Sequence, residues 1–137
     1  MEAVKDIAIS YFNDGNNCVE TVMKTCSDVL DLHLPEESYR MASILGGGIG
    51  GSGCACGALT GASLVLGALV GRTNPQEKTK QEMNAPVHEF YTIWMKHFGV
   101  SCCRVLKSPA HGVVPCPELM SVTAEMLVRF IKDRGIK

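Results

Sequence analysis

The stretch ILGGGIGGSGCACGALTGASLVLGALVG, residues 44–71, decides the fold. It contains no charged residue and falls into two unlike halves. Residues 46–53 hold too many glycines for a stable helix or strand. Residues 54–71 are continuous, apolar and mostly small, and a helix that is apolar all round is normally buried. The stretch therefore predicts a glycine loop feeding a central buried helix, with Cys54 and Cys56 in its first turn.

One face of this predicted helix has almost no side chains. Gly57, Gly61 and Gly67 recur at helical spacing, so neighbouring backbones can approach closely. We expect this to be the most buried helix, with neighbours packed against those glycines. The same face also suits a contact between two copies of the chain, which leaves a homo-oligomer open.

Cysteines at a helix start have a chemical consequence. The first turn has unpaired N–H groups and the positive end of the helix dipole, which favour an anion. A thiol there can have a pKa below the free value of about 8.5 and supply a thiolate near neutral pH. The competing interpretation is packing, because free cysteine is among the most buried residue types.

Length and charge place the chain in a broad class. A sequence of 137 residues fits one domain, residues 1–137, and the net charge is −1 with both signs well mixed. This pattern indicates no nucleic-acid groove. The N-terminus does not resemble a signal peptide, so we expect a cytoplasmic protein. The uncharged run exceeds the roughly 20 residues that span a bilayer, but its glycine-rich half would leave backbone groups unsatisfied in lipid, so no membrane span is expected.

The remaining chain has helical periodicity throughout. No segment is typical of a strand, so the sequence predicts an all-α, single-domain bundle of five to seven helices around residues 54–71. In the first half of the chain we expect a helix over residues 2–13, a second capped by Asn16 or Asn17, and a third that starts at Pro35 and has Met41, Ile44 and Leu45 on its apolar face. After the central helix we expect one from Pro75 to residue 98, which Pro86 kinks or splits, and a short one over residues 102–106. The last expected helix starts at Pro117, with Cys116 at its cap.

The seven cysteines are placed regularly along these elements. Cys26 lies on an apolar helix face, whereas the others stand at or within the first turn of four predicted helices: Cys18, Cys54, Cys56, Cys102, Cys103 and Cys116. In a reducing compartment such a set indicates redox or metal chemistry more than a structural disulfide framework. The odd number also means that the cysteines cannot all pair within one chain.

Short catalytic and metal-binding motifs are mostly missing from the sequence. Gly46, Gly48 and Gly51 match GxGxxG, but they follow a predicted helix where a dinucleotide fold has a strand. No CxxC, CxxCH or HExxH occurs, and the ferredoxin spacings are absent. We interpret the four histidines as surface or satisfied residues: His33, His88, His97 and His111.

The cysteines and glycines together resemble a known family. Residues 56–61 read CGALTG and follow GGGIGGSG, with Cys18 upstream and Cys103-Arg104 and Cys116 downstream. This ordered combination resembles the redox-active family named C_GCAxxG_C_C, small single-domain proteins with four characteristic cysteines. The resemblance covers nearly the whole chain and implies that those cysteines are Cys18, Cys56, Cys103 and Cys116. Cys54 and Cys102 are extra neighbours that the pattern lacks, and Cys54 would be a supporting thiol.

Three functions follow from these residues. The leading hypothesis is a cytoplasmic thiol–disulfide oxidoreductase that needs no cofactor and acts on a redox protein or a small thiol or disulfide. In it Cys56 attacks, and Cys18, Cys103 or Cys116 resolves the mixed disulfide. The alternative is an electron-transfer module in which the same four cysteines ligate an iron–sulfur cluster or another metal. In the third, the cysteines only pack.

Both redox hypotheses require the cysteines to converge. We therefore expect Cys56 close to at least one of Cys18, Cys103 and Cys116, in a pocket partly open to solvent. The loop that contains Gly48, Gly50, Gly51 and Gly53 would let other helix ends reach it, because few side chains stand in the way.

Overall fold

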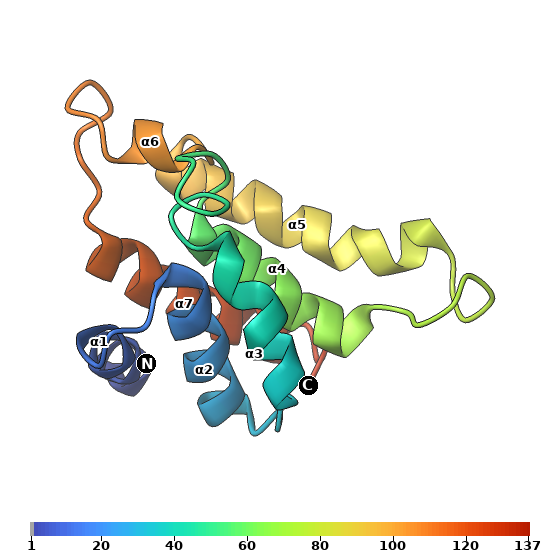
Figure 1. Cartoon of the computed structure of the whole chain (residues 1–137). Coiled ribbons are helices and arrows are strands. Elements are labelled where there is room, and N and C mark those ends of the chain that lie inside the picture. The colour runs from blue at the N-terminus through green and yellow to red at the C-terminus, as the bar shows by residue number, and fades with distance from the viewer. Residues whose placement is uncertain (1) are drawn as a thin grey trace.

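The computed structural model describes residues 2–137 and has the all-α architecture that the sequence predicts. Within those residues it contains seven α-helices and one short 3-10 helix, connected by loops (Figure 1). They are α1 (Glu2–Asn13), α2 (Cys18–Leu30), α3 (Glu36–Ala42), η1 (Ser43–Leu45), α4 (Gly57–Val70), α5 (Lys80–Phe98), α6 (Cys103–Leu106) and α7 (Cys116–Asp133).

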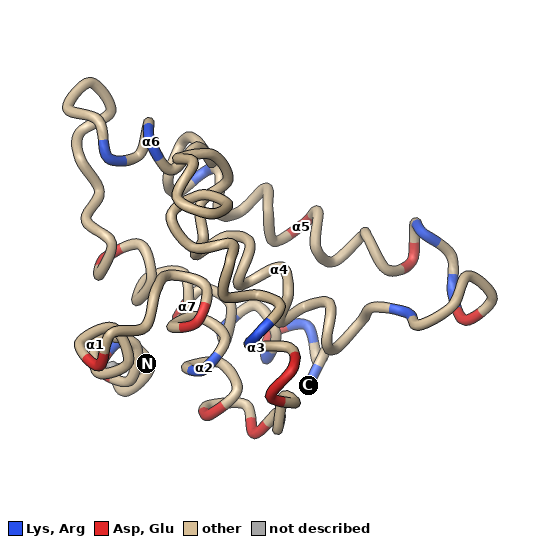
Figure 2. The backbone as a smooth tube through the Cα atoms, viewed as in Figure 1, with Lys and Arg blue, Asp and Glu red and all other residues tan. Residues whose placement is uncertain are grey.

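Helix α4 is central, and two of its glycines set how closely α2 packs on it. A Cβ atom built on Gly57 would lie 2.9 Å from the Cβ of Cys18, and one on Gly61 would lie 3.1 Å from the carbonyl oxygen of Val19. Both positions therefore need glycine for the approach of the two helices. Figure 2 shows that α4 and the loop before it carry no charged residue, as expected for segments at the centre of a bundle.

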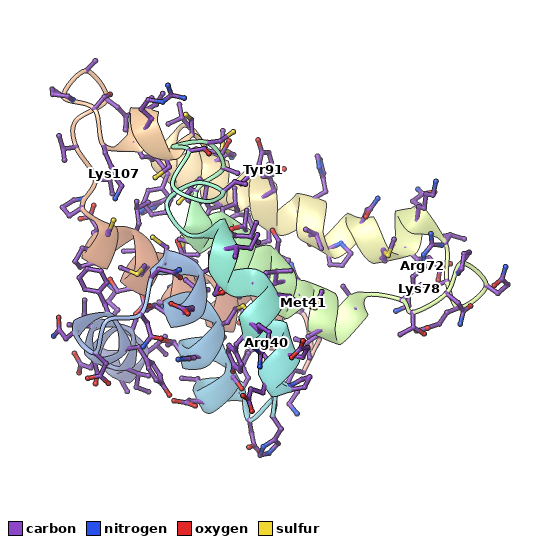
Figure 3. The ribbon with its side chains drawn as sticks, in the orientation of Figure 1. Arg40, Met41, Arg72, Lys78, Tyr91 and Lys107 are labelled. Atoms are coloured by element: carbon purple, nitrogen blue, oxygen red, sulfur yellow. The ribbon has the colours of Figure 1, made fainter. Side chains whose placement is uncertain are left out.

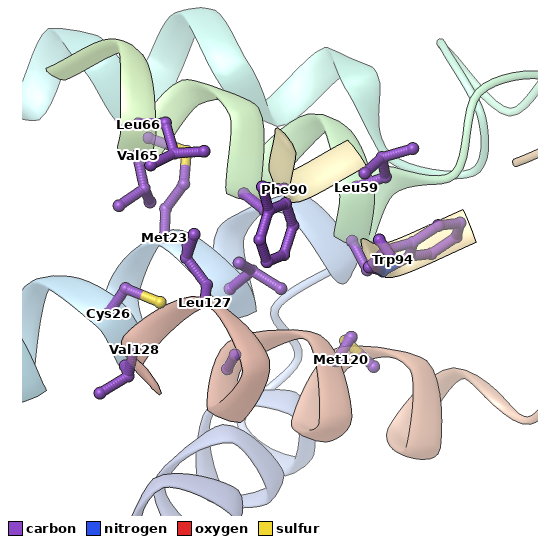
Figure 4. Close-up of a cluster of buried hydrophobic side chains, with 14 of the residues drawn as sticks. Met23, Cys26, Leu59, Val65, Leu66, Phe90, Trp94, Met120, Leu127 and Val128 are labelled. Carbon is purple, nitrogen blue, oxygen red and sulfur yellow. The ribbon is translucent and has the colours of Figure 1, made fainter. Parts of the chain in front are cut away.

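The hydrophobic core lies between α2, α4, α5 and α7 (Figure 4). Its largest fully buried side chain is Trp94 of α5, whose indole Nε1 donates a hydrogen bond to Thr123 Oγ1 of α7 at 2.9 Å. The buried polar tip is thus satisfied inside the core. Other buried members of the same core are Met23, Leu59, Leu66, Phe90, Met120, Leu127 and Val128.

Helix α4 differs from its prediction in two respects. It begins at Gly57, with Cys56 as the capping residue and Cys54 outside the helix, because residues 54–56 are extended instead. Its burial is also one-sided. Leu64 is 39% exposed, and a Cβ on Gly67 would meet no atom within 4 Å. Only the half of α4 that faces α2, α5 and α7 is covered.

The predicted apolar face of the third helix is largely solvent-exposed. Met41 is 71% exposed and Ile44 65% exposed, while Leu45 is partly buried against the core (Figure 3). Helix α3 lasts only seven residues before the chain tightens into η1. A helix of two turns can place only a few side chains against the core. The apolar side chains of Met41 and Ile44 therefore continue the periodic pattern without being covered by another element.

Helix α5 also starts later than expected. Residues 71–79 form turns, and the helix begins at Lys80 after a capping box in which the Thr79 side chain accepts from the backbone of Glu82. Pro86 lies inside the helix and does not split it. Proline removes one backbone donor, which one long packed helix can tolerate. Gly99 ends α5 as predicted.

The long uncharged run of residues 44–71 is not one continuous helix. The run divides into a coil of glycines and a helix of 14 residues, Gly57–Val70. Across residues 2–137, none of the helices combines the length and the apolar character that crossing a bilayer requires.

Candidate thiol site

The glycine loop is a compact coil held by its own backbone. Gly53 N donates to Gly47 O at 2.9 Å, and Cys54 N donates to Gly48 O at 3.0 Å. Gly48, Gly50, Gly51 and Gly53 all have positive φ, a conformation that glycine adopts without strain. A Cβ on Gly48 would lie 2.4 Å from Cys54 N and 3.0 Å from the Cβ of Cys103. The loop therefore packs its bare backbone against the cysteine segments.

Beyond the loop, residues 54–56 run antiparallel to residues 101–103. Ala55 and Cys102 form an isolated β-bridge, flanked by hydrogen bonds from Cys56 N to Ser101 O and from Cys103 N to Cys54 O, at 2.8 and 2.5 Å. Side chains alternate along extended backbone, so Cys54, Cys56 and Cys103, which flank the bridging pair, project to the same side, with Cys103 directly opposite Cys54. Cys56 and Cys103 are diagonal neighbours across the bridge. Both are buried, at 1% and 7% exposure.

Cys18 joins this group from α2. It is the first residue of its helix, behind the Asn17 capping box, and its Cβ sits against the bare Cα of Gly57, the residue after Cys56. Asn17 also donates from Nδ2 to Ser43 O at 2.9 Å, which ties the start of α2 to η1 just before the glycine loop. The local capping chemistry therefore positions Cys18 beside the start of α4.

Cys116 approaches from the other end of the chain. It begins α7, and its sulfur lies near enough to Cys18 to raise the pKa of the Cys18 thiol. The Lys107 ammonium donates to Cys116 Sγ. Figure 3 shows Lys107 on the segment between α6 and α7. An ammonium group beside sulfur stabilises negative charge on it.

The electrostatics of Cys18 reflect this crowding. Burial and, to a smaller extent, the neighbouring Cys116 and Cys56 thiols raise the pKa of Cys18 to about 12, against the opposing effect of Lys107. For Lys107, burial acts to lower the pKa, but the hydrogen bond to Cys116 and the nearby sulfurs of Cys116, Cys103 and Cys18 raise it overall. One ammonium therefore faces several sulfurs, and it favours the charged form of whichever is ionised.

Cys56 does not have the lowered pKa that its helix-start position suggests. Burial raises the pKa of the Cys56 thiol, although backbone N–H groups of Leu59 and Ala58 act in the opposite direction. The helix-start effect is present, but desolvation outweighs it. The expectation that Cys56 lies in a solvent-open pocket is also wrong, because its side chain is 1% exposed.

The remaining predicted residues lie around this cluster. Cys54 is exposed, and Cys102 is half-buried and donates from Sγ to Gly53 O at 3.2 Å. The Arg104 side chain is exposed, while its backbone N donates to Gly53 O. Cys26 is fully buried in the core, as its apolar position indicates. Sequence reasoning missed Lys107, which has no motif of its own; its one signal was its place between Cys103 and Cys116.

The four family cysteines thus form a string of neighbours, which we call the thiol cluster: Cys116, Cys18, Cys56 and Cys103. Among residues 2–137, the His, Cys, Asp and Glu side chains form no group of three that could hold a metal ion. One cavity of about 350 Å³ lies apart from the cluster and is lined by Met23, Met41, Leu45, Leu64 and others between α3 and α4.

Comparisons with known proteins agree with the cysteine pattern. A family model described as "Putative redox-active protein (C_GCAxxG_C_C)" matches residues 16–130. A curated protein of Archaeoglobus fulgidus, named only as an uncharacterised protein, is 28% identical, with 97% of this chain and 96% of that protein aligned. No solved structure was found to match. Because the match spans residues 16–130, which is most of the chain and includes all four cysteines of the cluster, this protein belongs to the C_GCAxxG_C_C family.

Proposed function

We propose that this protein carries out dithiol–disulfide exchange, with Cys116 as the attacking thiol and Cys18 as the resolving thiol. The observation that carries the proposal is the contact of the Lys107 ammonium with Cys116 Sγ, together with the neighbouring Cys18 thiol, whose pKa the Cys116 sulfur raises. A cation, a partly exposed sulfur and a neighbouring second thiol are the elements that such exchange needs.

The reaction proceeds in two displacements. The Cys116 thiolate attacks a substrate disulfide, forms a mixed disulfide and releases one substrate thiolate, which takes up a proton. The Cys18 thiol then loses its proton and attacks the Cys116 sulfur, which releases the second substrate thiolate. Two cysteine thiols become one disulfide, and the substrate disulfide gains two electrons and two protons.

Exposure and charge assign the first step to Cys116 instead of Cys56. Cys116 is half-buried at the start of α7, whereas Cys56 is 1% exposed. A substrate disulfide must align with the attacking sulfur along the S–S axis, which a buried thiol does not allow. Cys18 fits the second step because its pKa, raised to about 12, keeps it protonated until Cys116 has reacted.

The direct test measures alkylation of each cysteine in the reduced protein by iodoacetamide, followed by tryptic mass spectrometry. Within the cluster Cys116 should react first. Replacing Lys107 with methionine keeps a side chain of similar length and removes its charge. The contact that is lost is partly exposed and worth about 0.5–1 kcal/mol, so alkylation of Cys116 should slow about two- to five-fold. The exposed Cys54 is the control and should react at an unchanged rate.

A second measurement identifies the disulfide itself. Tryptic peptides 6–24 and 108–129 contain one cysteine each, Cys18 and Cys116, so a cross-link between them identifies the pair without ambiguity. Oxidation of the reduced protein by oxidised glutathione should produce that cross-linked peptide. Absence of the cross-link would overturn the proposal. Anaerobically purified protein that carries stoichiometric iron, with absorption near 400 nm, would also overturn it and would favour the metal alternative.

A further inference from the structure

The thiol cluster extends inward beyond the exchange pair. Cys18 touches Gly57 beside Cys56, and the β-bridge sets Cys56 on the same side of the backbone as Cys103. The cluster therefore contains two pairs, an outer one that solvent reaches and an inner one, diagonal across the bridge, that solvent does not reach.

We propose that Cys56 and Cys103 form a second, inner dithiol that exchanges electrons with solvent-borne disulfides only through Cys18 and Cys116. This inference rests on the proposed function, because it requires the Cys18–Cys116 disulfide to form first. It gives the chain a capacity of two disulfides, so that one molecule can reduce two substrate disulfides in turn.

The relay balances within the protein. Cys56 loses its proton and attacks Cys18 of the outer disulfide, which forms a Cys18–Cys56 disulfide and releases the Cys116 thiolate. Cys103 then attacks Cys56, which forms the Cys56–Cys103 disulfide and releases Cys18. The two protons of the inner thiols end on Cys116 and Cys18. The outer pair is again reduced, and the original oxidant is the substrate disulfide.

Two structural features favour this route. Direct attack on the inner pair from solvent is blocked, since Cys56 is 1% and Cys103 7% exposed. The glycine loop covers Cys103 with bare backbone; a side chain on Gly48 would approach the Cys103 Cβ to 3.0 Å. Lys107 also lies near the leaving sulfur, because its ammonium contacts Cys116.

The experiment uses full-length reduced protein in which Cys54 and Cys102 are serine, because each shares a tryptic peptide with an inner cysteine. Serine at position 102 keeps a donor for Gly53 O. The probe is excess oxidised glutathione, with acid quenching, blocking of free thiols and mass spectrometry over time. We expect the 6–24/108–129 cross-link first, then a link between peptides 41–72 and 97–104 whose formation rate does not depend on glutathione concentration.

Single substitutions in this background separate the steps. Cys18→Ser should slow the inner disulfide about ten-fold or more, since it removes the intramolecular route. Cys103→Ser should still form the outer disulfide first and then convert part of it into the link between peptides 6–24 and 41–72, which is the Cys18–Cys56 intermediate that Cys103 can no longer resolve. Cys26→Ser, at a buried position outside the cluster, is the matched control and should oxidise like the parent. Circular dichroism of each variant checks that it is folded.

The outcomes distinguish this inference from the function on which it rests. If the parent forms no Cys18–Cys116 disulfide, the proposed function fails. If it forms that disulfide but never the inner one, or if folded Cys18→Ser forms the inner disulfide at the parental rate, the exchange function survives and the relay is wrong.

Discussion

Replacing Gly61 with alanine tests the close packing on which the thiol cluster depends. The new methyl carbon would lie 3.1 Å from Val19 O and 3.2 Å from Val19 Cα, and both are backbone atoms that no rotamer change can move. Helix α2 would have to shift by a few tenths of an ångström. Overpacking of this kind costs about 1–3 kcal/mol.

Alanine also favours the helix, and that gain must be subtracted. It is about 1 kcal/mol relative to glycine inside a helix. The net change at Gly61 is therefore a destabilisation of about 1 kcal/mol. Gly67 offers a matched control in the same helix, because a Cβ there meets no atom within 4 Å. Gly67→Ala should stabilise the protein by about 0.5–1 kcal/mol through the helix term alone.

Urea unfolding of the reduced proteins at pH 7 measures both changes. The two variants should differ by about 2 kcal/mol, which corresponds to midpoints about 1 M apart for an ordinary urea slope. The slopes themselves should match that of the parent. If Gly61→Ala is as stable as Gly67→Ala, then α2 does not press against α4, and the placement of Cys18 beside Cys56 loses its structural basis.

Two further predictions concern buried groups. Burial raises the pKa of Cys26 to about 12, so the folded protein keeps a proton on this thiol that the unfolded chain releases near pH 9. The contribution of this shift to the free energy of unfolding is complete below pH 9 and is lost as the pH rises towards 12. Between pH 8 and pH 10 the parent should lose about 1.4 kcal/mol more than Cys26→Ala in urea unfolding, and parallel losses would contradict the assignment. Thr25 Oγ1 is buried without a hydrogen-bond partner, whereas Thr123 Oγ1 accepts from Trp94. Thermal melts should therefore show Thr25→Val stabilised by about 1 kcal/mol and Thr123→Val destabilised by about 1–3 kcal/mol, and equal shifts would argue against the difference in hydrogen bonding.

The helices were predictable because their signals are local. The Asn17 cap, the positions of Pro35 and Pro117, and Gly99 at the end of α5 are short-range chemistry, and the structure places helix ends at or next to them. The sequence predicts that α4 starts at residue 54, whereas it starts at Gly57, and the cause is a contact between distant parts of the sequence. Residues 54–56 are extended because they pair with residues 101–103, which lie far away in the sequence.

Burial was harder to predict than helix type. The pattern at Met41 and Ile44 is as apolar as that of a core helix, yet both side chains face solvent. Periodicity identifies a face that can be covered, but tertiary packing determines which faces are covered. The same limit applies to Lys107, whose role depends on a sulfur that only the fold brings to it.

The choice of nucleophile shows how two predictable effects compete. Cys56 has the backbone donors of a helix start, and they do lower its pKa relative to burial alone. The packing that places it there also buries it against α2 and the loop, and the cost of desolvating a thiolate is the larger effect. Cys116 also begins a helix but keeps access to solvent and gains an ammonium group. Helix position thus indicated six cysteines and the family resemblance selected four of them, while burial and one lysine give the order in which we expect them to react.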